Sequence, residues 1–165
     1  MRNKDGSVYN YFIQPGYIYL PVSPTKISAV LGSSVAVSIY DKTKKTGGMA
    51  HFLYPEIHIE DQPRAIYGDV SIKALIKMFI NIGSKKESLE AQIFGGAFNK
   101  SHSNKNIGKN NILSAQKILI RERIPITSED TGGEKGRKII FDTHTNEIVI
   151  LKVEKLRQSD WYPYS

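Results

Sequence analysis

Ser34 and His51 are the two side chains whose surroundings in the sequence favour nucleophilic catalysis. Ser34 follows the small-residue turn Leu31-Gly32-Ser33 and begins an apolar, β-branched run. His51 follows the small residues Gly47-Gly48-Met49-Ala50, of which we expect Gly47-Gly48 to end a turn and Met49-Ala50 to begin the next strand. A histidine beside a hydroxyl is the minimum unit for nucleophilic catalysis. The spacing therefore predicts a Ser34–His51 dyad.

A dyad of this kind needs groups that orient it and stabilise charge. Ser28, on the strand that leads into Gly32, is our candidate for the third group, and Gly32 and Ser33 supply backbone N–H groups suited to an oxyanion. Gly95-Gly96 predicts a further turn around the same pocket. The alternative is structural, because a serine after a glycine usually bonds its own backbone in a turn. A lone histidine in a strand is likewise more often a core residue than a catalyst.

Other kinds of site find little support in this sequence. It has no cysteine, which excludes disulfides, thiolate metal sites and cysteine nucleophiles in the chain as it stands. His58, His102 and His144 fall in separate loops without metal-ligand spacing. Neither Gly95-Gly96 nor Gly132-Gly133 is followed by a phosphate-loop pattern. We therefore expect neither a metal site nor a phosphate-binding loop.

Length and charge set the broad class of the protein. The 165 residues predict one domain, residues 1–165, with a core of about 16–153. No apolar run approaches the roughly 20 residues of a membrane span, so we expect no membrane insertion and a cytoplasmic protein. The net charge of +7 favours acidic partners. The basic residues are dispersed and no nucleic-acid-binding motif accompanies them, so we expect no nucleic acid.

Hydrophobic patterning predicts an α+β fold. Apolar residues at helical spacing predict helices over about 70–82, with Asp69 as N-cap and Gly83 after the C-terminus, and over about 108–122. The first dozen residues look irregular. Short apolar runs bounded by turn residues predict strands at 17–20, 26–31, 35–40, 49–54, 89–94, 124–128, 137–141 and 147–153. Because most strands follow one another through short turns, we expect packed sheets with helices outside.

The motifs together are more specific than any one of them. In their order and spacing, the sequence resembles the CheD family of chemoreceptor glutamine deamidases from about Gly16 to Val153. The matching segments are Leu31-Gly32-Ser33-Ser34-Val35-Ala36-Val37, Gly47-Gly48-Met49-Ala50-His51-Phe52, Tyr67-Gly68-Asp69, Leu89-Glu90-Ala91-Gln92-Ile93-Phe94-Gly95-Gly96-Ala97, Asn106-Ile107-Gly108-Lys109-Asn110-Asn111, Asp130-Thr131-Gly132-Gly133 and Gly136-Arg137-Lys138.

The resemblance implies a compact sandwich of mixed β-sheets with flanking helices, similar to toxin-type cysteine deamidases. It implies hydrolysis of glutamine side-chain amides in methyl-accepting chemotaxis receptors, or of receptor glutamyl esters, without a cofactor, and in some species a CheC-like phosphatase partner. The family's Cys-His-Thr constellation maps onto Ser34, His51 and Ser28. Ser38 stands where many members have a second cysteine.

Serine at position 34 leaves three interpretations open. In the first, a cysteine was exchanged for serine by design, to trap substrate or avoid oxidation. In the second, the chain is a natural member that binds its partners without turnover. In the third, it is a natural serine variant that is active. Serine is much harder to deprotonate than cysteine, whose pKa is about 8.5. The sequence thus predicts a deamidase site whose nucleophile is in question, with a receptor- or CheC-binding module as the alternative function.

Overall fold

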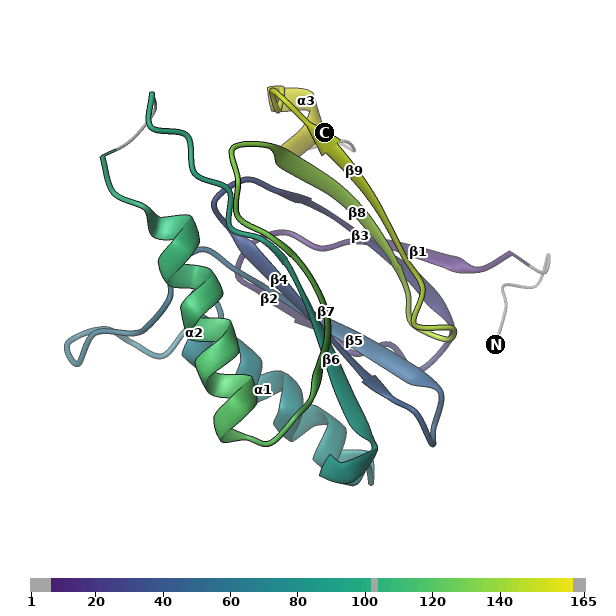
Figure 1. The fold of residues 1–165 in the computed structure, drawn as a ribbon. Coiled ribbons are helices and arrows are strands. Elements are labelled where there is room, and N and C mark those ends of the chain that lie inside the picture. Colours follow the sequence, from purple (N-terminus) through teal and green to yellow (C-terminus); the bar gives the residue numbers. More distant parts are fainter. Residues whose placement is uncertain (1–6, 102–103, 162–165) are drawn as a thin grey trace.

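The computed structural model describes residues 7–101 and 104–161, and these form a three-layered α+β fold (Figure 1). The strands are β1 (Tyr9–Phe12), β2 (Tyr17–Tyr19), β3 (Thr25–Leu31), β4 (Val35–Asp41), β5 (Thr46–Phe52), β6 (Leu89–Gly95), β7 (Ile126–Thr131), β8 (Gly136–Asp142) and β9 (Ile148–Val153). The helices are α1 (Gly68–Asn81), α2 (Ile107–Arg121), the short α3 (Gln158–Trp161) and the 3-10 turn η1 (Lys86–Ser88).

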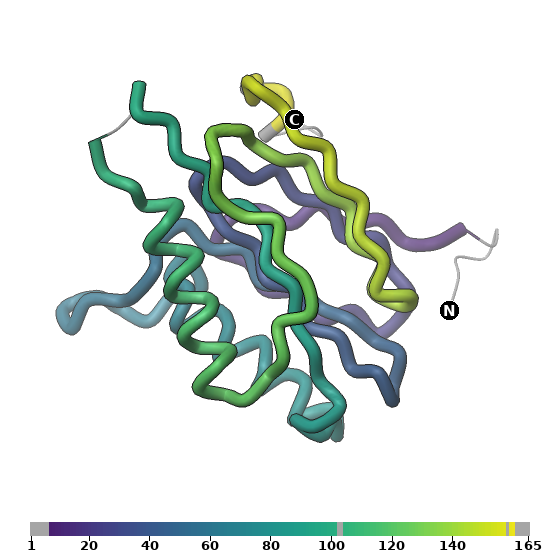
Figure 2. The backbone as a smooth tube through the Cα atoms, in the orientation of Figure 1, coloured from purple at the N-terminus to yellow at the C-terminus, as the bar shows by residue number. Residues whose placement is uncertain are grey.

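The strands form two mixed sheets that pack face to face. One sheet has the order β1-β3-β8-β9 and the other β2-β5-β4-β6-β7. In Figures 1 and 2 the helices α1 and α2 lie together on one side of the five-stranded sheet, and the four-stranded sheet lies on its other side. The expected α+β sandwich is confirmed, and its two long helices share one face.

The central strand β4 explains this layering. All seven of its residues are buried, so the strand carries apolar side chains on both faces. Val35, Val37 and Ile39 pack with the helices, whereas Ala36 packs between the sheets with Phe94.

Both long helices form where apolar periodicity predicts them, but the start of α1 differs. The residue at the N-cap position is Tyr67 and not Asp69, which lies inside the first turn. The Asp69 carboxylate accepts from the N–H groups of Val70 and Ile57, so it bonds the preceding loop as well as the helix. Gly83 follows the helix end with φ +90, as expected of a residue that stops a helix.

Two expectations about strands are wrong. Residues 9–12, taken as irregular, form β1, which pairs in parallel with Thr25–Ser28 of β3; the pairing partner is distant in sequence, so no local pattern announces it. Gly47 and Gly48 do not form a turn but lie inside β5. A Cβ on Gly47 would meet the Phe141 ring at 2.8 Å, so these glycines let neighbouring groups approach β5 closely.

No helix among the described residues has the length and apolar character needed to cross a membrane.

Candidate active site

Sheet pairing brings Ser34 and His51 together. Strands β4 and β5 are antiparallel, with Ala36 opposite His51, and Ser34 lies just before β4 on the same side of the ladder. The Ser34 Oγ lies 2.9 Å from the His51 Nε2. The His51 Nδ1 lies 3.1 Å from the Ile13 carbonyl oxygen. Because a carbonyl only accepts, Nδ1 carries the proton, and in the neutral ring Nε2 is free to accept from the Ser34 hydroxyl.

Both side chains of the dyad are buried, and this burial governs the protonation of His51. Ser34 is 3% exposed and His51 is 1% exposed. Burial lowers the pKa of His51 from 6.5 to about 4, although the bond to the Ile13 carbonyl opposes the shift. The imidazole is therefore neutral at physiological pH, in the tautomer that a general base requires.

Ser28 does not join the dyad through its side chain. Its neighbours Ile27 and Ala29 point into the core between the sheets, so alternation along β3 places Ser28 on the opposite face. Its hydroxyl donates weakly, at 3.5 Å, to the Tyr11 carbonyl, and its own carbonyl accepts from the Ile13 N–H. Ser28 thus contacts the segment that carries the Ile13 carbonyl, which is the group that orients His51.

The glycine turn after β6 packs directly on the backbone around Ser34. The Gly96 N–H donates to the Ser34 carbonyl at 2.9 Å, and the Ala97 N–H donates to the Gly32 carbonyl at 2.9 Å. Gly95 has φ +102, and a Cβ there would lie 2.4 Å from the Ser34 carbonyl oxygen. Gly32, Gly95 and Gly96 therefore belong to one packed unit with Ser33 between them, and this unit holds the backbone carbonyls of Gly32 and of Ser34 itself.

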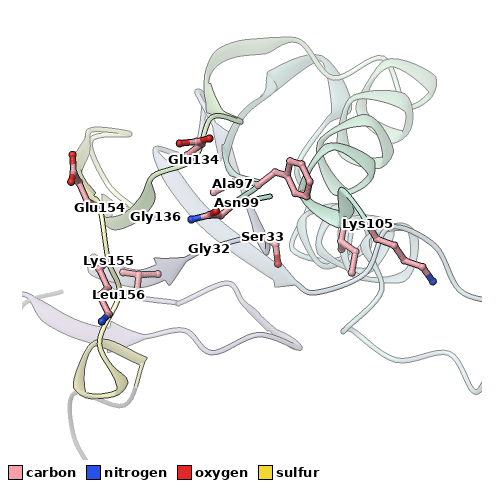
Figure 3. Close-up of a pocket in the computed structure, with 13 residues that line it drawn as sticks. Gly32, Ser33, Ala97, Asn99, Lys105, Glu134, Gly136, Glu154, Lys155 and Leu156 are labelled. Carbon is pink, nitrogen blue, oxygen red and sulfur yellow. The ribbon is translucent and has the colours of Figure 1, made fainter. Parts of the chain in front are cut away.

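A pocket of about 450 Å³ opens beside this unit. Ser33, next to Ser34, lines it, as do Gly32 and the N-terminal residues Ile107 and Gly108 of α2 (Figure 3). The N-terminus of a helix carries partial positive charge, which favours developing negative charge. The remaining lining residues are Ala97, Phe98, Asn99, Lys105, Glu134, Gly136, Glu154, Lys155 and Leu156.

A buried arginine holds the turn that precedes Glu134 and Gly136, two of the residues that line this pocket. Arg137, with its side chain 3% exposed, donates to the Asp130 carboxylate at 2.9 Å and to the Gly132 carbonyl at 2.9 Å. Burial raises the pKa of Asp130, but bonds from Arg137 and Lys152 outweigh burial and lower it. The Gly133 carbonyl in turn accepts from the Phe98 N–H. The 132–133 turn therefore links Arg137 to Phe98, which lines the pocket.

Two site residues escape sequence reasoning. Ile13 acts through its backbone carbonyl, so its side chain gives no signal. Asn111 is fully buried in α2, and its Nδ2 donates to the carbonyls of Ser33 and Leu53, each at 2.9 Å. No role was predicted for Asn111, although it lies in the segment 106–111 that matches the family and on the buried face of a helix with apolar neighbours, and these were the available signals.

The other histidines of the sequence are not part of this dyad as far as the structure describes them. His58 and His144 are exposed, and His144 lies near the Lys45 carbonyl. His102 lies outside the described residues. In the part of the chain that the structure describes, no three His, Asp or Glu side chains gather as a metal site would require.

Comparison with known proteins adds an independent result. Residues 55–152 match the family described as "CheD chemotactic sensory transduction". A protein of Trichlorobacter lovleyi named "Probable chemoreceptor glutamine deamidase CheD" is 37% identical over 153 residues, covering 91% of this chain and 95% of the relative. The "Probable chemoreceptor glutamine deamidase CheD 1" of Anaeromyxobacter dehalogenans is 38% identical, covering 79% of this chain and 77% of the relative. The "Chemoreceptor glutamine deamidase CheD" of Bacillus licheniformis is 37% identical, covering 81% and 84%. Because the family match spans more than half of the sequence and these relatives are covered over most of their length, the chain belongs to the CheD family.

Proposed function

We propose that this chain carries the site of a chemoreceptor glutamine deamidase, with Ser34 at the nucleophile position and His51 as general base. The substrates would be glutamine side chains in the cytoplasmic helical region of methyl-accepting chemotaxis receptors. One observation carries the proposal. The Ser34 Oγ lies 2.9 Å from the Nε2 of His51, and the Ile13 carbonyl sets the tautomer of the ring in which this nitrogen is free to accept. The names of the relatives supply the substrate class.

The proposed reaction has two halves. As the Ser34 Oγ attacks the carboxamide carbon, its proton passes to the His51 Nε2 and the carbonyl oxygen becomes an oxyanion. The C–N bond then breaks, the amide nitrogen takes the proton from Nε2, and ammonia leaves an acyl-enzyme. Water gives a proton to Nε2, attacks the acyl carbon and releases glutamate, and the proton returns to Ser34.

The hydroxyl makes this chain a slow catalyst. Burial holds the pKa of His51 at about 4, so His51 is a weak base for a serine proton. A cysteine thiol, with an ordinary pKa of about 8.5, is much easier to ionise beside an imidazole. Loss of a working nucleophile costs a hydrolase on the order of a millionfold in turnover. We therefore expect Ser34→Cys to raise deamidation at least about a hundredfold.

The test follows amide-to-acid conversion in a receptor cytoplasmic fragment by peptide mass spectrometry. Ser34→Cys is compared with Ser38→Cys, which adds a thiol inside β4, the strand that follows Ser34, at a site that is also buried, at 1% exposure. Only Ser34→Cys should gain activity, and adding His51→Ala to it should remove that gain. If a known family member deamidates the fragment and Ser34→Cys does not, the enzyme proposal is contradicted.

The alternative is a binding module that docks on receptors or on a CheC-like phosphatase without turnover. Ser34, together with the lowered pKa of His51, favours this alternative for the chain as it stands. It predicts that the unmodified chain binds a receptor fragment, or a CheC-like protein, as tightly as Ser34→Cys does in calorimetry. Absence of binding to both would exclude it.

The proposal also covers the setting of the protein. If the substrate is the cytoplasmic region of a receptor, the protein acts in the cytoplasm. We propose that it acts as one domain of residues 1–165. The dyad chemistry needs no cofactor. The residue that the native gene encodes at position 34 separates the first interpretation of Ser34, exchange by design, from the two natural ones, and turnover by the unmodified chain separates those two.

A further inference from the structure

Asn111 links the two backbone segments that carry the dyad. It lies in the second turn of α2, fully buried, and its Nδ2 reaches the carbonyl oxygens of Ser33 and Leu53, each at 2.9 Å. Ser33 immediately precedes Ser34, and Leu53 follows the end of β5, two residues after His51. A single side chain therefore bonds next to both members of the dyad.

The chemistry of a primary amide suits this link. Its nitrogen carries two N–H donors at a fixed angle, so the positions of two accepting carbonyls are fixed with respect to each other. The two acceptors also assign the amide orientation, since a carbonyl cannot donate to Oδ1. Aspartate and leucine would offer no donors to these carbonyls at neutral pH, and serine would offer only one.

Packing alone does not account for this amide. The Asn111 Oδ1 is buried and makes no hydrogen bond among the described residues, which is unfavourable for stability. On the same face of α2, Ala115, Ile118 and Leu119 are buried apolar side chains that meet the sheet without such a penalty. The amide is therefore best explained by the two carbonyls, of Ser33 and Leu53, that its nitrogen bonds.

We propose that Asn111 is a positioning residue that keeps Ser34 and His51 at reacting distance by fixing the carbonyls of Ser33 and Leu53. The inference deepens the proposed function and rests on it, because it extends the same site to a third element, α2. Asn111 acts through the backbone and has no proposed contact with substrate.

The test compares Asn111→Leu with Ser114→Ala. Leucine is similar in size to asparagine and lacks its donors. Ser114 lies one turn further along the same face and donates to the Pro55 carbonyl at 2.6 Å, so its change also removes one buried bond between α2 and the backbone. Both variants are made in the chain as it stands and in the Ser34→Cys background.

The first measurement does not depend on activity. Nitrogen-15 NMR of the His51 ring in the chain as it stands reports which nitrogen carries the proton. The shift of Nε2 also reports whether that nitrogen accepts a hydrogen bond. The Ile13 carbonyl should hold the proton on Nδ1 in all three proteins. Ser114→Ala should keep the Nε2 shift of the unmodified chain, whereas Asn111→Leu should change it because the Ser34 hydroxyl no longer donates to Nε2. The second measurement is deamidation in the Ser34→Cys background. There Asn111→Leu should lower kcat about a hundredfold with KM changed less than about twofold, since small misplacements of reacting groups cost this much.

Either result can overturn the inference. A folded Asn111→Leu protein with the Nε2 shift and kcat of Ser114→Ala contradicts it. If Asn111→Leu does not fold, Asn111→Ser, which keeps one donor, must show the same changes in the same direction. Failure of both to fold also contradicts the inference, because Asn111 would then serve folding and not positioning. If Ser34→Cys shows no deamidation, the proposed function fails, while the NMR result still decides the role of Asn111.

Discussion

The helices α1 and α2 cover the same face of the five-stranded sheet, yet they bury different kinds of side chain. The buried face of α1 is mostly apolar, with Ile72, Leu75, Ile76 and Phe79. The first half of α2 instead buries Gly108, Asn111 and Ser114. The α1 face packs against side chains of the sheet, whereas Asn111 in the first half of α2 contacts backbone beside Ser34 and after His51.

The difference teaches how one layer serves two purposes. Apolar burial is non-directional, so it stabilises the fold without fixing any one atom. Hydrogen bonds to backbone carbonyls are directional, and they can hold particular residues in place. We infer that α1 chiefly stabilises the sheet, and that α2 both stabilises it and fixes the geometry of the site.

The largest effect should come from the apolar helix. Phe79 is fully buried in the core between α1 and the sheet, so Phe79→Ala should lower the free energy of unfolding by about 3–5 kcal/mol. Urea unfolding measures this loss, with the neighbouring Ile80→Ala, 42% exposed, as the control. In the Ser34→Cys background, the kcat of the folded fraction should stay within about twofold. A large fall in kcat would show that α1 also positions the dyad.

The second prediction concerns the buried dyad itself. Unfolded His51 takes up a proton near pH 6.5, but the native ring does so only near pH 4, so the unfolded state binds more protons between these values. Stability should therefore fall as the pH drops from 6.5 to 4, by about 3 kcal/mol from this group. Urea unfolding at several pH values measures the slope, and His51→Gln should flatten it. Equal slopes in the two proteins would mean that His51 is not held neutral by burial.

The smallest of these effects should come from the contact between α2 and the glycine turn. A Cβ on Gly108 would lie 2.4 Å from the Gly96 carbonyl oxygen, and backbone cannot move aside easily. Gly108→Ala should therefore cost about 2 kcal/mol of stability and also lower kcat in the Ser34→Cys background. The control is Gly83→Ala after α1, where a Cβ meets only the flexible end of Lys44 beyond 3.8 Å and any cost comes from its φ of +90. If Gly108→Ala reduced stability without changing kcat, the proposed division between the helices would be lost.

Much of the fold could be predicted because its signals are local. The apolar spacing at 70–82 and 108–122 predicts two helices that the structure places at Gly68–Asn81 and Ile107–Arg121. The strand β1 could not be predicted in the same way. Its four residues are exposed or half-buried and pair with β3, whose paired residues lie 16 positions away.

The residues of the site likewise divide into those with a local signal in the sequence and those without one. Small residues before Ser34 and His51 suggested the pair, and the antiparallel register of β4 and β5 brings the two side chains together. The third partner of His51 could not be found, because a backbone carbonyl at Ile13 leaves no mark on residue type. Ser28 has a suitable residue type, but the direction of its side chain follows from which face of β3 meets the core.

The sequence by itself determined the α+β class, the two long helices and the candidacy of Ser34 and His51. These depend on residue type and on short-range periodicity, which are present in the chain before it folds. Only the tertiary structure decided that Ile13 orients the imidazole, that Ser28 faces away, and that Asn111 reaches the backbone beside both dyad residues. These contacts join segments far apart in sequence, and hydrogen bonds form only where packing brings donor and acceptor within about 3 Å.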